Sequence, residues 1–255
     1  MSRLNASPTL NSSPILNASP ILKTAMQSLL IFCSVTCSAI SQAAPDQVVL
    51  LHGIAKSRAS MDSLASSLTT AGYRVINLDY PSTDTTIEAQ ASLLLPEIKA
   101  SITPDRTVHL VGHSMGGLIA LVLAEQLQDY RLGRMVQLGT PNGGSEVADW
   151  LEHNALFKRF YGPAGGQLTT QARGQHAIDD LSIELGIIAG KLSVDPLSSL
   201  IIPGKDDGKV AVMRTTHPGM RDHITLNVAH PFLPRSKRAQ RQVRHFLKYG
   251  TFERQ

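Results

Sequence analysis

One short segment in the middle of the chain limits the fold more than any other. Residues 108–111 read as an apolar strand, the next five are Gly-His-Ser-Met-Gly, and 118–123 are apolar on every side of a helix. A serine in so tight a strand-to-helix turn has a strained backbone and no room for neighbouring side chains. Gly112 and Gly116 leave that room around Ser114. The segment therefore predicts an exposed serine between a buried strand and a buried helix.

Strands and helices alternate along the rest of the chain. Alternation with ten or more residues in each crossover predicts a mostly parallel sheet of about six strands, covered by helices on both faces. Pro96 is expected to kink or interrupt the second helix. Gly117 is expected to let the helix after Ser114 approach the sheet closely. The expected strands are 48–51, 74–78, 107–111, 134–138, 186–189 and 224–228, and the helices carry apolar residues at 61, 64 and 68 and at 87, 91, 94, 95 and 98.

A serine hydroxyl needs a histidine to take its proton and a carboxylate to orient that histidine. In a strand-serine-helix fold of this kind the acid and then the histidine follow the serine along the chain. Asp207, in the polar turn before Gly208, is the preferred acid. Asp206 is its nearest alternative, and Asp195 is a weaker one.

His230 is the predicted base, because it follows the expected strand 224–228 in a loop that can reach over the carboxyl edge of the sheet. His223 is expected before that strand, at the wrong edge. His217 comes earlier still, and His245 falls in the last helix. These three are interpreted as surface or structural histidines.

Two backbone N–H groups are needed to stabilise the oxyanion of an acyl-transfer reaction. Met115, directly after the serine, is expected to supply one, and Ile54, in the loop after the first strand, the other. Gly53 permits close approach of the substrate to that loop. His52 and His113 are interpreted as structural, the latter helping to shape the turn.

The net charge of +4 does not indicate nucleic-acid binding, because it comes from the ends of the chain. Of the 24 basic residues, two lie within 1–43 and seven within 235–255, which leaves 15 basic against 19 acidic residues between them. The final helix, near 236–248, should turn Val243, Phe246 and Leu247 inward and its basic residues to solvent. Transient contact of that helix with an acidic lipid surface is the alternative.

Residues 1–43 are typical of a secretory signal peptide behind a disordered extension. Three Asn-x-Ser-Pro hexads fill 5–22, where the prolines oppose helix and sheet alike, and Met26 is an alternative start. Lys23, the apolar run 25–40 and Ser41-Gln42-Ala43 follow, which predicts cleavage after Ala43 and a catalytic domain over 44–255. The protein is thus expected to be exported, to the periplasm or beyond, although a membrane anchor is the alternative.

Cys33 and Cys37 both lie in the apolar run, so the processed chain would hold no disulfide and no thiol nucleophile. A lipid anchor on either cysteine is disfavoured because Phe32 and Thr36 precede them. No nucleotide-binding pattern and no cluster of metal-ligand residues is visible, so neither an organic cofactor nor a metal is expected.

Taken together, these motifs resemble the α/β-hydrolase superfamily, in its bacterial lipase and esterase branch, over essentially all of residues 46–250. The motifs are 51–53 (Leu-His-Gly), 112–117, 138–144 (Leu-Gly-Thr-Pro-Asn-Gly-Gly), 207–210 and His230. The superfamily has an eight-stranded sheet, whereas this chain begins almost at the equivalent of the third strand, so it resembles the minimal six-stranded version. The calcium site and disulfide of some lipases in this branch are not expected here.

The resemblance implies a serine hydrolase that cleaves carboxylic esters through an acyl-enzyme, with Ser114, His230 and Asp207 as its triad. Acyl transfer or thioester or amide cleavage on the same triad remains open, as does a binding protein that merely keeps the fold. Between Trp150 and Pro196 the strand-helix alternation lapses. Phe157, Phe160, Tyr161 and 162–166 either line or cover an acyl pocket or form a surface excursion over a buried aromatic cluster, and the residues leave both interpretations open.

Overall fold

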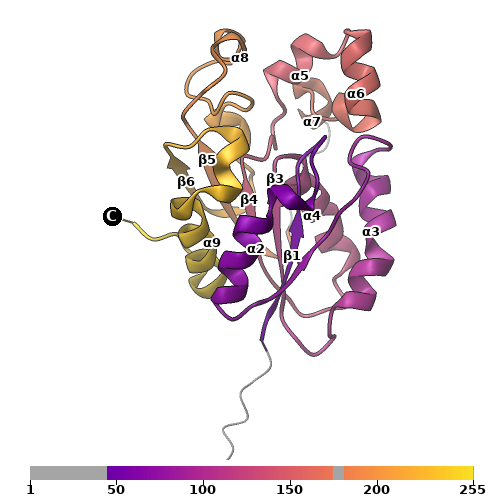
Figure 1. The fold of residues 1–255 in the computed structure, drawn as a ribbon, viewed down its shortest axis with the longest axis vertical. Coiled ribbons are helices and arrows are strands. Elements are labelled where there is room, and N and C mark those ends of the chain that lie inside the picture. The colour runs from indigo at the N-terminus through magenta and orange to yellow at the C-terminus, as the bar shows by residue number, and fades with distance from the viewer. Residues whose placement is uncertain (1–44, 175–180, 255) are drawn as a thin grey trace, which may run out of the picture. The chain divides into compact units, whose positions relative to one another are not determined.

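The computed structural model describes residues 45–174 and 181–254, which belong to one compact unit. The predicted signal peptide, Cys33 and Cys37 lie outside the described residues. Six parallel strands form one sheet in the order β2-β1-β3-β4-β5-β6, which confirms the predicted fold class (Figure 1). The strands are β1 (Gln47–Leu51), β2 (Arg74–Asn77), β3 (Val108–His113), β4 (Leu132–Leu138), β5 (Glu184–Gly190) and β6 (Met220–Leu226).

Four helices cover the two faces of the sheet. In Figure 1, α2 (Asp62–Thr70) and α9 (Lys237–Tyr249) lie side by side on one face, and α3 (Ile87–Ser101) and α4 (Met115–Gln126) lie on the other. The shorter elements gather above the carboxyl ends of the strands, where α5, α6 and α7 lie apart from α8. These are η1 (Arg58–Ser60), α5 (Glu146–Leu151), α6 (Ala155–Gly166), α7 (Thr170–Gly174), α8 (Pro196–Ile201), η2 (Val212–Thr215) and η3 (His230–Arg235).

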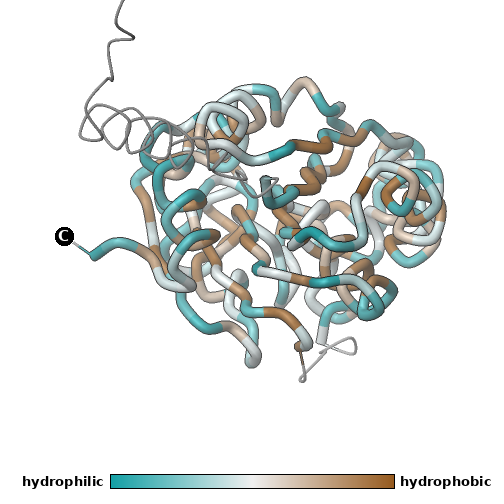
Figure 2. Tube along the Cα trace, turned by 90° about the horizontal axis from the view of Figure 1, so that it is seen from below, coloured by the Kyte–Doolittle hydropathy of each residue, from teal (hydrophilic) through white to brown (hydrophobic). Residues whose placement is uncertain are grey.

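The sheet separates two hydrophobic cores, as strands buried on both faces require. Along β1, Val49 and Leu51 pack with α3 and α4, whereas Val48 and Leu50 pack with α2 and α9. In Figure 2, several hydrophobic segments, in brown, accordingly lie in the middle of the molecule. The predicted inward residues of α9, Val243, Phe246 and Leu247, are all buried. The two cores fix the sheet, and with it the positions of the loops that follow each strand.

The structure corrects two expectations. β6 begins at Met220, four residues earlier than predicted, so His223 lies within the strand rather than before it. Helix α3 runs without interruption through Pro96. A proline removes one hydrogen bond, but Ile87, Ala91, Leu94 and Ile98 on either side of it are buried, and their packing holds the helix together. Within the described ranges, no helix is long and apolar enough to cross a membrane.

Candidate active site

Ser114 occupies a strained turn between β3 and α4. Its φ of 54° and ψ of −127° are unusual for a residue other than glycine, as the sequence predicted. The turn is held by hydrogen bonds from the Ser114 N–H to the Leu138 carbonyl (2.8 Å) and from the Thr140 hydroxyl to the Ser114 carbonyl (3.0 Å). Strain at this position is therefore maintained by the strand next to it.

At each of the three glycines of the turn, other atoms lie too close to leave room for a Cβ. A Cβ at Gly112 would lie 2.4 Å from the Gly116 carbonyl oxygen, inside the turn itself. At Gly116 it would lie 2.4 Å from the Leu51 carbonyl oxygen, and at Gly117 it would lie 2.0 Å from the Thr140 hydroxyl oxygen. The turn can therefore form only where these side chains are missing, and it seats α4 directly against the ends of β1 and β4.

Asp207 and His230 come together at the carboxyl edge of the sheet. The His230 Nδ1 lies 2.8 Å from Asp207 Oδ2, and because a carboxylate only accepts, Nδ1 carries the proton. The other carboxylate oxygen accepts from the N–H groups of Lys209 (3.1 Å) and Val210 (2.9 Å), and the His230 N–H donates to the Asp207 carbonyl (2.9 Å). Both side chains are nearly buried. The remaining ring nitrogen, Nε2, is left as the basic one.

The alternative acids are engaged elsewhere. Asp206 Oδ1 accepts from the Ser199 hydroxyl (2.8 Å) and the Gly208 N–H (2.7 Å). Asp195 caps α8 through Ser198 and lies 2.8 Å from the Lys209 ammonium, and these hydrogen bonds hold the pKa of its carboxyl well below the usual range. Neither carboxylate contacts His230.

The alternative histidines are also engaged in local contacts. His223 Nε2 lies 3.0 Å from the Thr215 hydroxyl, His217 Nδ1 accepts from the Gly219 N–H (3.0 Å), and His245 Nδ1 donates to the Thr251 carbonyl (2.7 Å). Of the histidines considered, His230 is thus the one that the structure joins to a candidate acid.

The loop after β1 lies against the serine. A Cβ at Gly53 would be 3.2 Å from Ser114 Cβ, which shows how closely the two segments approach. His52 is fully buried beneath this loop, stacks on Tyr80 at 3.9 Å and donates from Nδ1 to the Gly53 carbonyl (2.9 Å). Burial lowers the pKa of His52, so it holds the loop as a neutral ring. Its position fits the structural role predicted for it.

Of the predicted N–H donors, Ile54 borders the cavity at Ser114, and Met115 is the first residue of α4. The N–H groups of a first helical turn have no partner within their helix, and Met115 is in the first turn of α4.

His113 links the serine turn to the histidine loop. Its Nε2 donates to the His230 carbonyl (3.0 Å), and the two rings are 4.9 Å apart. Burial, followed by the nearby His230, lowers the pKa of His113 to about 3, so the ring is neutral at ordinary pH. Its Nδ1 is buried without a hydrogen-bond partner. His113 thus positions the backbone of His230.

A cavity of about 360 Å³ opens beside Ser114 and His230. Among the described residues no hydrogen bond joins these two side chains, a separation common before substrate binds. One wall of the cavity is apolar and comes from α5, α6 and the segment after them. The side chains of that wall belong to Val147, Ala148, Leu151, Phe157, Tyr161 and Leu168.

The aromatic residues of α6 divide between cavity and surface. Phe157 and Tyr161 line the cavity with their rings 4.7 Å apart, whereas Phe160 is 62% exposed. The interpretation that these residues line a pocket therefore holds for two of the three aromatic residues. The alternative, a buried cluster of all three, does not hold because Phe160 is exposed. The apolar residues of α5 were not singled out from the sequence, although their spacing at 147, 148 and 151 is that of one helical face.

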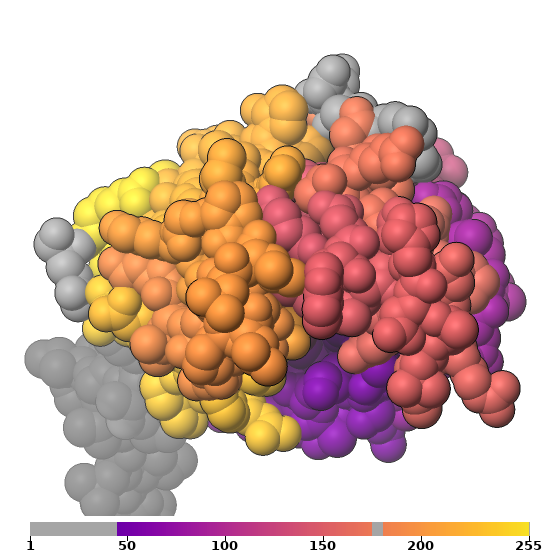
Figure 3. Space-filling model, turned by 90° about the horizontal axis from the view of Figure 1, so that it is seen from above, coloured from indigo at the N-terminus to yellow at the C-terminus, as the bar shows by residue number. Residues whose placement is uncertain are grey.

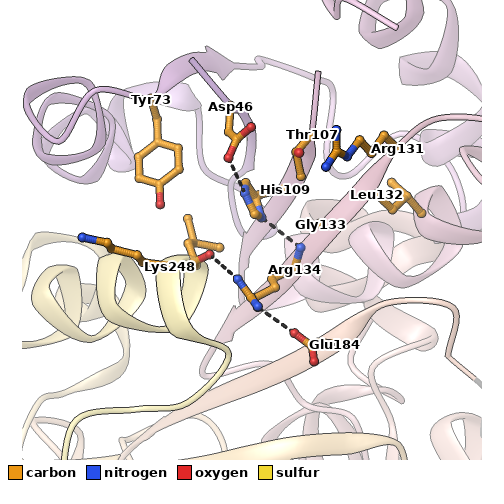
Figure 4. Close-up of a pocket in the computed structure, with 11 residues that line it drawn as sticks. Asp46, Tyr73, Thr107, His109, Arg131, Leu132, Gly133, Arg134, Glu184 and Lys248 are labelled. Atoms are coloured by element: carbon orange, nitrogen blue, oxygen red, sulfur yellow. Dashed lines mark hydrogen bonds and ion pairs between the residues drawn. The ribbon is translucent and has the colours of Figure 1, made fainter. Parts of the chain in front are cut away.

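Another cavity, of about 420 Å³, lies at the opposite edge of the sheet (Figure 4). His109 points between Asp46 and Arg134, accepting the Arg134 N–H at Nδ1 (2.9 Å). The Arg134 guanidinium donates to Glu184 (2.6 Å) and to the Leu247 carbonyl (2.8 Å). No serine or cysteine is among the residues that line it, and ligands of parallel sheets bind at the carboxyl edge. The candidate active site is therefore the cavity at Ser114.

Across residues 45–174 and 181–254, no group of three or more metal-ligand side chains could hold a metal ion.

Comparison with known proteins matches part of the chain to a family. Residues 46–163 match the family described as the alpha/beta hydrolase fold. The chain is 29% identical over 109 residues to a protein of Bacillus subtilis (strain 168) named phospholipase YtpA, a match that spans 39% of this chain and 42% of that relative.

Solved structures agree in fold. The mature Bacillus licheniformis lipase BlEst2 superimposes with a TM-score of 0.63 at 22% identity, over 81% of this chain and 92% of that one. YbtT, a type II thioesterase from the yersiniabactin biosynthetic pathway, gives 0.54 at 15% identity, over 81% and 92%.

The six-stranded parallel sheet and the serine in its strand-to-helix turn are features of the α/β-hydrolase fold. This is the fold that the family matched by residues 46–163 describes.

Proposed function

We propose that the protein is a serine hydrolase that cleaves carboxylic esters through an acyl-enzyme. The observation that carries the proposal is the buried Asp207–His230 pair beside the strained Ser114. Ser114 attacks the ester carbonyl while His230 Nε2 takes its proton. Asp207 fixes the tautomer of His230 and stabilises the imidazolium that forms. His230 then returns the proton to the departing alcohol.

The tetrahedral oxyanion is stabilised by the N–H groups of Ile54 and Met115, and one such donor typically contributes about 3 to 4 kcal/mol to the transition state. Water on the same base then hydrolyses the acyl-enzyme. The apolar wall of α5 and α6 holds the acyl chain. The similar proteins are named a lipase, a phospholipase and a thioesterase. The names lipase and thioesterase describe cleavage of acyl groups and support this reaction class.

Export of the enzyme is part of the proposal and rests on the sequence pattern of residues 1–43 alone. Expression with a C-terminal tag, followed by fractionation of the cells and mass measurement of the product, tests it. We expect a chain that begins at Ala44 outside the cytoplasm.

The enzymatic proposal is tested with a fluorophosphonate probe and a panel of p-nitrophenyl esters from acetate to palmitate. The wild-type protein should be labelled and should cleave the shorter esters. Ser114→Ala should fold, resist labelling and turn over roughly 10³-fold or more slowly, because only binding and the oxyanion hole remain. Near-wild-type turnover in that variant would refute the proposal. An acyl-thioester substrate, assayed in parallel, distinguishes thioester cleavage from ester cleavage. A wild-type protein that neither reacts with the probe nor cleaves any substrate would favour a binding role.

A further inference from the structure

The cavity at Ser114 is asymmetric in chemistry. Its α5–α6 wall is apolar, whereas two lysines, Lys56 and Lys209, border it elsewhere, and no acidic side chain lines it. A plain hydrocarbon ester gains nothing from ammonium groups at this position. The asymmetry thus suggests a substrate with an apolar end and an anionic end.

The two lysines differ in their partners. Lys209 Nζ lies 2.8 Å from Asp195 Oδ2, so its charge is already paired. Lys56 is exposed, and no carboxylate among the described residues lies within ion-pair distance of its ammonium. A cation that borders a cavity without a carboxylate is available to a ligand.

The backbone on both sides of Lys56 is fixed. Ala55 has a φ of 52°, an unusual value for a residue with a side chain, and its N–H donates to the Ser82 hydroxyl (3.0 Å). On the other side the Arg58 N–H donates to Asp79 Oδ1 (3.2 Å). The strain at Ala55 is thus maintained by neighbouring contacts, directly before a lysine that borders the cavity.

Lys56 is also close to the reacting groups. It is two residues beyond Ile54, and both border the cavity with Ser114. After burial and His230, the charge of Lys56 is a further cause of the lowered pKa of His113. Seen from above, part of the early described chain, in indigo, is visible between the salmon and orange parts of the surface (Figure 3). An acyl chain on the α5–α6 wall would therefore leave the alcohol portion of the ester towards Lys56.

We propose that Lys56 binds an anionic group on the alcohol portion of the substrate, so that the enzyme prefers acyl esters carrying a phosphate or similar anion close to the ester bond. This inference rests on the proposed ester hydrolysis and names its substrate class. The apolar wall binds the acyl chain, Lys56 binds the anion, and the ester carbonyl between them reaches Ser114. Lys56 acts here on specificity and takes no part in proton transfer.

The test compares 1-octanoylglycerol with 1-octanoylglycerol 3-phosphate, both at concentrations where they are monomeric. For the wild-type protein we expect kcat/KM to be about 10-fold higher for the phosphate ester, the size of a charge-assisted contact. In Lys56→Gln the ratio should fall to about 1. Raising the salt concentration should reduce the wild-type ratio, because the pair is screened.

Two further variants locate the effect. Lys209→Gln removes the other cation at the cavity, and Lys158→Gln removes an exposed cation of α6 that does not line it. The ratio should persist in both. Loss of the ratio in Lys209→Gln, with its retention in Lys56→Gln, would overturn the assignment to Lys56. Equal rates on both esters in the wild-type protein would also overturn it, but would leave the proposed ester hydrolysis intact. If the wild-type protein cleaves neither these esters nor p-nitrophenyl butyrate, both proposals fail.

Discussion

His230 and His109 each lie beside an aspartate, the first at the carboxyl edge of the sheet and the second at the opposite edge. At the first pair, Nδ1 and Oδ2 are 2.8 Å apart and the carboxylate is fully buried. At the second, His109 Nε2 and Asp46 Oδ2 are 3.9 Å apart and the Asp46 side chain is 50% exposed (Figure 4). Both histidines are nearly buried, so burial of the ring does not distinguish them.

The difference lies in what the histidine nitrogens are committed to. His109 uses Nδ1 to accept the N–H of Arg134, and no serine or cysteine is among the residues that line its cavity. His230 uses Nδ1 to donate to a carboxylate that two backbone N–H groups also hold, and its Nε2 stays free to act as a base beside Ser114. A histidine and an aspartate make a catalytic pair when the carboxylate is fixed and the second nitrogen faces a substrate cavity.

The sharpest test of this contrast replaces each histidine by glutamine. His230→Gln should lower kcat for p-nitrophenyl butyrate by roughly 10³-fold or more, because the proton acceptor is lost. His109→Gln should keep kcat within about twofold, since it lies at the far edge of the sheet. Steady-state kinetics of both variants, with circular dichroism to confirm folding, decides the matter. Comparable losses in the two would show that the second pair also serves catalysis.

The second test concerns which carboxylate orients the base. Asp207→Asn should lower kcat by about 10²-fold or more, because an amide no longer selects the correct tautomer of His230. Asp206→Asn is the matched control at the neighbouring position and should retain most activity, since its carboxylate bonds only to Ser199 and Gly208. Reversed penalties would assign the acid to Asp206.

The third test uses His109, at the opposite edge of the sheet, and measures how the free energy of unfolding depends on pH. Burial lowers the pKa of His109 to about 4 from an ordinary value of 6.5. Between these pH values the unfolded chain binds a proton that the folded chain does not. Stability is therefore fully present above about pH 6.5 and is lost as the pH falls towards 4, by about 1 kcal/mol per pH unit from this group.

Urea unfolding of the wild-type protein and of His109→Gln at pH 7, 6 and 5 measures this dependence. The free energy of unfolding should fall less steeply with decreasing pH in the variant. An unchanged slope in His109→Gln would show that folding does not lower the pKa of His109.

Sequence reasoning located the sheet because each strand is a short apolar segment bounded by polar turns. It missed the start of β6, since Arg221, Asp222 and His223 are polar. These residues are in a strand because β6 pairs with β5 from Met220 to Leu226, a tertiary constraint that propensity does not contain. The interruption expected at Pro96 is absent for the same reason, because packing against the core outweighs one lost hydrogen bond.

At the site, the residues with strict local requirements could be found from sequence. A serine between glycines after a strand has few other interpretations, and Asp207 before Gly208 occupies a recognisable turn. The α5 side of the apolar wall and Lys56 were not found, because their function depends on segments far apart in the chain meeting at one cavity. The sequence does not show how close these segments lie to one another in the folded protein.

The final prediction concerns the wall of the cavity and has the smallest expected effect. A mobile lid would raise the rate sharply once an ester exceeds its solubility, because an interface would stabilise an open form. The segment that includes α6 is instead fixed to the start of α3. Gln167 accepts from the Ile87 N–H (2.7 Å) and donates to Glu88 (2.8 Å), and a Cβ at Gly162 would overlap the Thr83 carbonyl oxygen at 1.7 Å.

We therefore expect rates on tributyrin to saturate smoothly through the solubility limit, with less than a twofold step. Gln167→Ala is the matched variant, because it releases the anchor without touching the cavity wall, and it should introduce curvature at the limit if the anchor is what keeps α6 in place. A clear jump in the wild-type protein would show that this wall opens at an interface. It would also mean that the carboxyl edge of the sheet, unlike the edge at His109, moves during the reaction.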